Sequence, residues 1–279
     1  MVDTLLYIRR ILNKIIHRQI VKDVKEIHFH EFERNLCNNL EIVLVCSTGR
    51  CGTKFFSELC GKNLKNIDCE HKPYPEFAYN QNYLFHGAAA AESRYFLVGR
   101  MESLSYAYFQ NKTYVEVSTK STVLLKEIIA TFPKLKVIHL WRDPREFVQS
   151  SMSRGYYKNT KISESRIYPS KGRKWKNDYS QLEKCYWNWL ETNRFILENS
   201  ANLDLSRLLS VNSSSMFKSV KVMRDMLEFV NDDKIDHEII TPKKVNSNAR
   251  PFSGPVDCKN EELMTAVNQL SNFLVDRSL

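Results

Sequence analysis

The sequence predicts an α/β fold with three layers, in which helices flank a mostly parallel central sheet. Short apolar runs alternate with helical patterns along the chain, which is typical of parallel strands joined by covering helices. Two of these runs also lead into turns rich in small or basic residues, each directly followed by a helical pattern. With 279 residues, 43% of them hydrophobic, the chain is long enough for one such domain over residues 1–279.

The first predicted element is an amphipathic helix at about residues 4–22. Apolar residues from Leu5 to Ile20 recur at helical spacing, with basic residues between them. Such a helix packs on its own domain or on a partner subunit, so a homodimer is one expectation and a membrane surface is the alternative. The basic residues interrupt any signal-peptide core, and no run reaches the roughly 18 apolar residues of a membrane span. We therefore expect a cytoplasmic protein without an integral membrane part.

The remaining elements follow in order along the chain. Four short apolar runs predict buried strands: Ile42–Cys46, Tyr95–Val98, Tyr114–Val117 and Val137–Trp141. Three longer patterns predict helices: Ser121–Phe132, Asp178–Asn199 and about Met216–Val230. The polar and basic segment Asn159–Asn177 is interpreted as an excursion or lid.

The turn after the first strand has the composition of an anion-binding loop. It contains Gly49, Arg50 and Gly52, and a helical pattern begins directly after it. Glycines let the backbone approach a ligand, and the first amides of a helix have no partner within the helix. The loop differs from the phosphate loop of nucleotide hydrolases, because Thr53-Lys54 stands where that loop needs Lys-Ser/Thr. A glycine-rich turn without a ligand is the alternative.

The turn after the strand Val137–Trp141 has a second set of anion-binding residues. Arg142 stands at the strand end, Asp143 can cap the next helix, and Ser150 follows Arg142 by eight residues. Open parallel sheets bind ligands beyond the carboxyl ends of their strands. Both turns are therefore predicted to lie at the same edge of the sheet, where an arginine fork and a hydroxyl suit a phosphate.

Together the two turns resemble the PAPS-dependent sulfotransferases of the small soluble type, where PAPS is 3′-phosphoadenosine-5′-phosphosulfate. That family's 5′-phosphosulfate loop reads Lys/Arg-Ser-Gly-Thr-Thr, and here it is Arg50-Cys51-Gly52-Thr53-Lys54. Its 3′-phosphate motif is an arginine and a serine eight residues later, here Arg142 and Ser150. The resemblance implies a P-loop-like fold, PAPS as donor, 3′-phosphoadenosine-5′-phosphate (PAP) as product, and no metal.

The resemblance also implies roles for single residues around the donor. Arg50 would contact the bridging and leaving oxygens, while Thr53 and the Gly52 amide would hold the 5′-phosphate. Phe55 matches a position where an aromatic ring packs on adenine, and a core phenylalanine is the alternative. Arg250, with the nearby Lys243 and Lys244, is expected to give a late contact to the 3′-phosphate.

Two residues of the first loop depart from the family pattern. Cys51 and Lys54 each replace a hydroxyl donor, and Lys54 adds a charge. Cys51 stands beside Arg50 and before a helix, which predicts a lowered thiol pKa and shielding by a bound nucleotide.

A hydroxyl acceptor needs a general base, and the sequence offers three candidates. Glu116 is the first, because it lies on a strand between the two motifs and resembles the glutamate of the Glu-Lys-Ser strand in glycan sulfotransferases. A carboxylate between valines is costly to bury unless it is paired, so an ion pair is the alternative. His71 and His86, both expected in loops, are the second and third candidates.

The expected function is sulfuryl transfer from PAPS to a hydroxyl or nitrogen of a small cytosolic molecule, such as a secondary metabolite. The formal net charge of +9 suits an anionic partner, but the basic residues are dispersed and no nucleic-acid motif is present. A P-loop kinase-like phosphotransferase and a sulfotransferase acting on a glycan or protein are the alternatives. If Glu70, Glu76, Glu102 and Glu116 border the pocket, a cationic acceptor would fit.

Overall fold

The computed structural model describes residues 29–75, 77, 94–158, 179–243, 252 and 254–279. The chain divides into two compact units, Met1–Asn39 and Leu40–Leu279. Helix α2 (Phe29–Asn39) is the described part of the first unit. The helix predicted at about 4–22 lies outside the described residues, so the single domain over 1–279 stays a prediction.

The second unit is built on one five-stranded sheet in which every neighbouring pair is parallel. The strand order is β2-β3-β1-β4-β5. The strands are β1 (Ile42–Cys46), β2 (Ile67–His71), β3 (Thr113–Val117), β4 (Lys136–Trp141) and β5 (Leu208–Asn212). This confirms the predicted parallel sheet and the strands at Ile42, Tyr114 and Val137.

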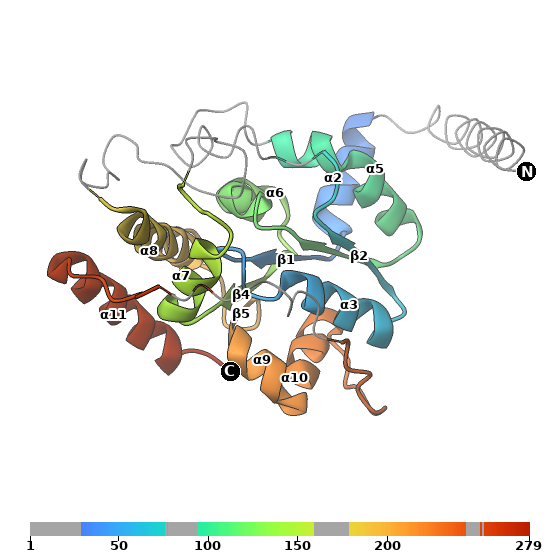
Figure 1. Ribbon diagram of the computed structural model, residues 1–279. Helices are drawn as coiled ribbons and strands as arrows, with labels where there is room; N and C mark the ends of the chain where they lie inside the picture. Colours follow the sequence, from blue (N-terminus) through green and yellow to red (C-terminus); the bar gives the residue numbers. More distant parts are fainter. Residues whose placement is uncertain (1–28, 76, 78–93, 159–178, 244–251, 253) are drawn as a thin grey trace, which may run out of the picture. The chain divides into compact units, whose positions relative to one another are not determined.

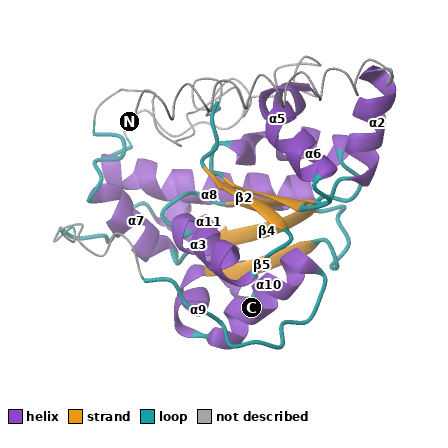
Figure 2. Ribbon diagram, turned by 90° about the vertical axis from the view of Figure 1, so that its right-hand side faces the viewer, coloured by secondary structure: helices purple, strands orange, loops and turns teal. Residues whose placement is uncertain are grey.

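Helices cover both faces of this sheet and complete the predicted three layers (Figure 1). One face carries α3 (Thr53–Asn63), α9 (Ser213–Lys218) and α10 (Val220–Asn231). The other carries α5 (Tyr95–Phe109), η2 (Ser121–Leu124), α6 (Leu125–Thr131) and α8 (Gln181–Ser200). Figure 2 shows the strands between α9 and α10 on one side and α5, α6 and α8 on the other. Helices α7 (Pro144–Met152) and α11 (Glu261–Asp276) pack on α8.

The core follows from the alternation of side chains along the strands. Val43 and Val45 of β1 pack into the cluster beneath α3 and α10, while Ile42 and Leu44 point to the opposite face. All five residues of β1 are buried, as expected for a central strand covered on both faces.

Two predicted elements differ in the structure, and one strand was not predicted. The strand predicted at Tyr95–Val98 is wrong, because these residues begin helix α5. The helix predicted over Met216–Val230 is two helices, separated at Ser219, whose extended backbone and side-chain bond to the Val222 amide start α10. Strand β2 was not predicted as a strand at all.

The topology gathers the strand ends that matter for a ligand. Since the strands are parallel, the residues that follow Cys46, His71, Trp141 and Asn212 all emerge at one edge of the sheet. None of the helices in the described parts of the chain is both long and apolar enough to span a membrane.

Candidate functional site

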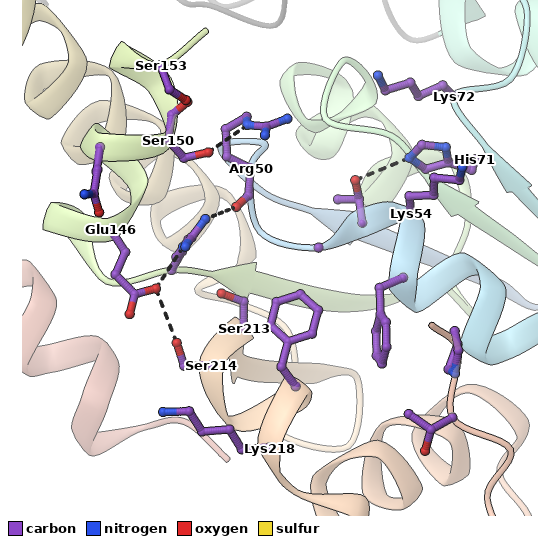
Figure 3. A pocket seen from close by; sticks show the side chains of 18 of the residues that line it. Arg50, Lys54, His71, Lys72, Glu146, Ser150, Ser153, Ser213, Ser214 and Lys218 are labelled. Carbon is purple, nitrogen blue, oxygen red and sulfur yellow. Dashed lines mark hydrogen bonds and ion pairs between the residues drawn. The ribbon is translucent and has the colours of Figure 1, made fainter. Parts of the chain in front are cut away.

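A cavity of about 890 Å³ lies at the carboxyl edge of the sheet. Its wall is formed by the first loop with the start of α3, the end of β2, helix α7 and helix α9 (Figure 3). The lining residues include Arg50, Gly52, Thr53, Lys54, Phe55, His71, Lys72, Arg142, Glu146, Ser150, Ser213 and Lys218. The cavity is therefore where both predicted anion-binding turns meet.

The loop between β1 and α3 is a tightly wound backbone cradle. Gly49, Arg50 and Gly52 all have positive φ, at 78°, 58° and 83°. Gly52 cannot be replaced without cost, because a Cβ there would lie 2.5 Å from the ring of Phe217. The first backbone hydrogen bond of α3 runs from the Phe56 amide to the Gly52 carbonyl (3.0 Å). The helix amides before Phe56 therefore have no acceptor within the helix.

The turn between β4 and α7 has the predicted cap. The Asp143 side chain accepts hydrogen bonds from the amides of Arg145 (2.9 Å) and Glu146 (3.1 Å). Arg142 is thereby held at the strand end, where its Nε donates to Glu146 Oε2 at 3.0 Å. The same side chain donates from Nη1 to the Arg50 carbonyl oxygen at 3.1 Å.

The two turns are joined directly across the cavity. Arg50 Nε donates to Ser150 Oγ at 3.0 Å, although the two residues are 100 positions apart in the chain. Burial is the main cause that lowers the pKa of the Arg50 guanidinium, and the charges of Arg154 and Arg142 lower it further. The structure thus brings together Arg50, Arg142 and Ser150, as the sequence predicted. Figure 3 shows the Arg50 guanidinium and the Ser150 hydroxyl in contact.

Cys51 does not have the predicted properties. Its side chain is fully buried in the core beneath the loop, where Sγ donates to the Gly49 carbonyl at 3.0 Å and lies 3.3 Å from Thr48 Oγ1. Burial raises the pKa of the thiol to about 11, which outweighs the opposing charges of Arg142 and Arg50. The prediction of a lowered pKa is therefore wrong, because the side chain points away from the cavity that its neighbours line.

Glu116 is held in a buried ion pair rather than on the cavity wall. Arg100 of α5 donates from Nε to Oε2 at 2.8 Å and from Nη2 to Oε1 at 3.1 Å, and both side chains are almost fully buried. The hydroxyls of Tyr114 and Ser121 also bind this carboxylate. The structure supports the ion-pair alternative and gives Glu116 a structural role.

His71 lies at the end of strand β2, not in a loop, and lines the cavity. Its Nε2 is 3.3 Å from Thr53 Oγ1 of the first loop. Burial lowers the pKa of the imidazole, the charges of Lys72 and Lys54 lower it further, and Glu58 partly opposes them. A lowered pKa keeps the ring neutral near pH 7, which is the form that accepts a proton.

Of the other predicted residues, one lines the cavity, one does not, and three lie outside the described residues. Phe55 lines the cavity and is also part of the core, where its ring meets Phe217 edge-on at a centroid distance of 5.0 Å. His86, Lys244 and Arg250 lie outside the described residues. Lys243 is described and exposed, but it is not among the residues that line the cavity.

The lining also includes residues that were not assigned to the site from sequence, among them Lys72, Glu146, Ser213 and Lys218. The Ser213 hydroxyl is buried and has no hydrogen-bond partner within the described part of the chain. A buried hydroxyl without a partner is costly, so a polar ligand in the cavity would satisfy it. Its position directly after strand β5, at the ligand-binding edge, is the signal that sequence reasoning could have used.

Comparison with known proteins identifies the fold. No family model and no curated protein matches the sequence. Among solved structures, the sulfotransferase domain from the Synechococcus PCC 7002 olefin synthase matches with a TM-score of 0.55 and 13% identity, covering 85% of this chain and 95% of that one. The sulfotransferase domain from the curacin biosynthetic pathway matches with a TM-score of 0.51 and 14% identity, covering 84% of this chain and 98% of that one. The chain therefore has the fold of the sulfotransferase domains.

Proposed function

We propose that this chain is a sulfotransferase that moves a sulfuryl group from PAPS to a hydroxyl or nitrogen of a small molecule. The observation that carries the proposal is the meeting of two anion-binding turns in one cavity. Arg50 bonds Ser150 at 3.0 Å, and Arg142 bonds the Arg50 carbonyl at 3.1 Å across a separation of 92 positions. The fold shared with sulfotransferase domains supports the same conclusion.

The residues of the cavity suit a nucleotide with phosphates at both ends. Arg142 and Ser150 would hold the 3′-phosphate, because a guanidinium and a hydroxyl together give several charge-assisted or neutral donors. Thr53 and the free amides at the start of α3 would hold the 5′-phosphate. The buried Ser213 hydroxyl, which has no partner among the described residues, supplies a further donor or acceptor for the nucleotide.

The chemistry follows from the positions of Arg50 and His71. Bound PAPS supplies a sulfuryl group whose transfer leaves negative charge on a phosphate oxygen. Arg50, partly desolvated in the cavity wall, would stabilise that charge as it develops. His71 would accept the proton of the acceptor hydroxyl while the new oxygen–sulfur bond forms. Glu116 is not proposed as the base, because Arg100 already occupies both of its carboxylate oxygens.

The acceptor class and cellular setting are proposals of the same kind. The two structural neighbours are named for curacin biosynthesis and an olefin synthase, which supports a small-molecule acceptor made in secondary metabolism. We propose a cytoplasmic enzyme, and a homodimer through the N-terminal helix stays an expectation. A phosphotransferase is less favoured, since Asp143 is engaged as the cap of α7 and is not free to hold magnesium.

Calorimetry with a small set of nucleotides tests the donor assignment. PAP should bind at least about tenfold more tightly than adenosine 5′-phosphate, which differs from it only by the 3′-phosphate. It should also bind more tightly than ATP. Equal or tighter binding of ATP would overturn the proposal, and transfer of label from [³⁵S]PAPS to an acceptor would support it.

A further inference from the structure

The cavity near the end of strand β2 contains two lysines to which the proposed donor site assigns no contact with PAPS. Lys54 of the first turn of α3 and Lys72, which directly follows His71, both line the cavity. Figure 3 shows both lysines on the His71 side, whereas Ser150, Ser153 and Glu146 lie on the other side of Arg50. The charges of both lysines also act on the His71 ring. Two cations therefore surround the group that would receive the acceptor's proton.

The carboxylates of this region offset those charges only at Lys54, through Glu58. Glu70, on the neighbouring strand position, is bonded by Ser103 (3.0 Å) and Tyr114 (2.7 Å). Glu116 forms an ion pair with the buried Arg100, and Glu102 is exposed on α5. Glu58 lies 3.8 Å from Lys54, in a largely exposed pair.

Lys72 is thus the cation nearest in sequence to the proposed base, and it has no ion-pair partner among the described residues. In the described lining, Glu146 is the one carboxylate, and it pairs with Arg142 on the opposite side. Of the four glutamates that suggested a cationic acceptor from sequence, Glu70, Glu102 and Glu116 do not line the cavity, and Glu76 lies outside the described residues.

The backbone at Lys72 is held in an unusual conformation. Its φ is +54°, which a residue with a Cβ adopts rarely, and its amide donates to the Val117 carbonyl at 3.2 Å. Such conformations persist where the surrounding structure enforces them and are concentrated at functional sites. The hydrogen bond to β3 therefore fixes the point from which the lysine side chain enters the cavity wall.

We propose that the acceptor carries an anionic group, such as a carboxylate, that pairs with Lys72 while its nucleophilic hydroxyl meets His71. Lys54 adds positive charge to the same part of the cavity, but Glu58 partly neutralises it through an ion pair. The inference rests on the proposed sulfotransferase function and narrows it to one class of acceptor. In the transfer step the acceptor oxygen bonds to sulfur, the bond between sulfur and the bridging oxygen breaks, its electron pair leaves on PAP, and the acceptor proton passes to His71.

The test uses three phenols of similar size that differ in charge: 4-hydroxyphenylacetate, 4-ethylphenol and tyramine. With [³⁵S]PAPS as donor, kcat/KM should be about 3- to 10-fold higher for the carboxylate than for the neutral phenol, and lowest for the amine. Lys72→Glu should abolish or reverse this order. Lys65→Glu makes the same charge change at an exposed position at the far end of β2 and should leave the order unchanged.

A second measurement decides the matter if none of these phenols reacts. In protein saturated with PAP, 4-hydroxyphenylacetate should slow carbethoxylation of His71 by diethyl pyrocarbonate, read by peptide mass spectrometry. Tyramine should protect less, and Lys72→Glu should remove the protection by the carboxylate. No protection by the carboxylate, or equal protection by tyramine, would overturn the anionic acceptor.

The outcomes separate this inference from the proposed function. If PAP does not bind, the sulfotransferase proposal fails. If PAP binds but tyramine is preferred, or the three phenols are equivalent, only the acceptor class fails. If Lys72→Ala weakens PAP binding more than about threefold while leaving discrimination among the phenols intact, Lys72 belongs to the donor site and the inference is overturned.

Discussion

Replacing Arg142 by alanine should weaken PAP binding selectively through the 3′-phosphate. Its side chain is 28% exposed, so the contact forms in a partly desolvated site. In the free protein the guanidinium already pairs with Glu146 at 3.0 Å, a partly exposed ion pair worth about 0.5 kcal/mol. A charge-assisted contact with a phosphate in such a site is worth about 2–4 kcal/mol.

The expected loss follows from the difference between these two contributions. Subtracting the pair given up in the free protein leaves about 1.5–3.5 kcal/mol, and each 1.4 kcal/mol changes the affinity tenfold. The dissociation constant of PAP should therefore rise about 10- to 300-fold. The affinity for adenosine 5′-phosphate, which lacks the 3′-phosphate, should fall much less.

Calorimetry with both nucleotides on both proteins measures the coupling between Arg142 and the 3′-phosphate. The comparison matters because Arg142 also donates a hydrogen bond to the Arg50 carbonyl. Loss of that bond could disturb the loop, which would weaken the binding of both nucleotides alike. Arg145→Ala is the matched control: its side chain is 67% exposed and it does not line the cavity. Equal losses for the two nucleotides, or no loss for PAP, would refute the assignment of the 3′-phosphate to Arg142.

Four further predictions concern the other parts of the site. Because burial and two neighbouring lysines lower the pKa of His71, activity should persist to lower pH than an ordinary histidine would allow and fall only below the lowered pKa, where the ring is protonated. His71→Gln should remove this acid limb in a pH–rate profile and reduce kcat by about 10²–10⁴-fold. Gly52→Ala should lower the free energy of unfolding in urea by about 2–4 kcal/mol through its positive φ and its clash with α9, whereas Gly61→Ala, with open space around its Cβ, should raise it by about 0.5–1 kcal/mol. Cys51 should resist iodoacetamide at pH 8 in the native protein and react after unfolding; rapid native labelling would contradict its buried position. Glu116→Gln should destabilise the protein by about 3–5 kcal/mol in urea titrations, yet leave the PAP affinity of the folded fraction unchanged.

The order of secondary-structure elements around the site, and the sheet edge at which its turns lie, were predictable from sequence. Strand, small-residue turn and helix follow one another at residues 42–63, and the parallel order then requires Arg50 and Arg142 to emerge at one edge. The direction of single side chains was not predictable. Cys51 turns into the core while Arg50 and Gly52 line the cavity, and no spacing rule distinguishes these neighbours.

The misassigned elements have physical reasons as well. Tyr95–Val98 is an apolar run too short to separate a buried helix from a strand; its helical period appears only with Arg100 and Leu104, which are buried further along α5. Strand β2 pairs with β3 alone at the sheet edge, so its half-exposed sequence IDCEH lacks an apolar pattern. An ion pair of Glu116 was one alternative from sequence, but its partner Arg100 was not identified, because Arg100 lies on the helix whose start was taken for a strand.

A crystal structure of the protein with PAP bound tests the central claim most directly. The account predicts the 3′-phosphate within hydrogen-bonding distance of the Arg142 guanidinium and the Ser150 hydroxyl, and the 5′-phosphate on the amides at the start of α3. His71 should then face the terminal oxygen of the 5′-phosphate, from which the sulfuryl group would leave. A nucleotide bound in the reverse orientation, or outside the cavity at the carboxyl edge of the sheet, would contradict the account.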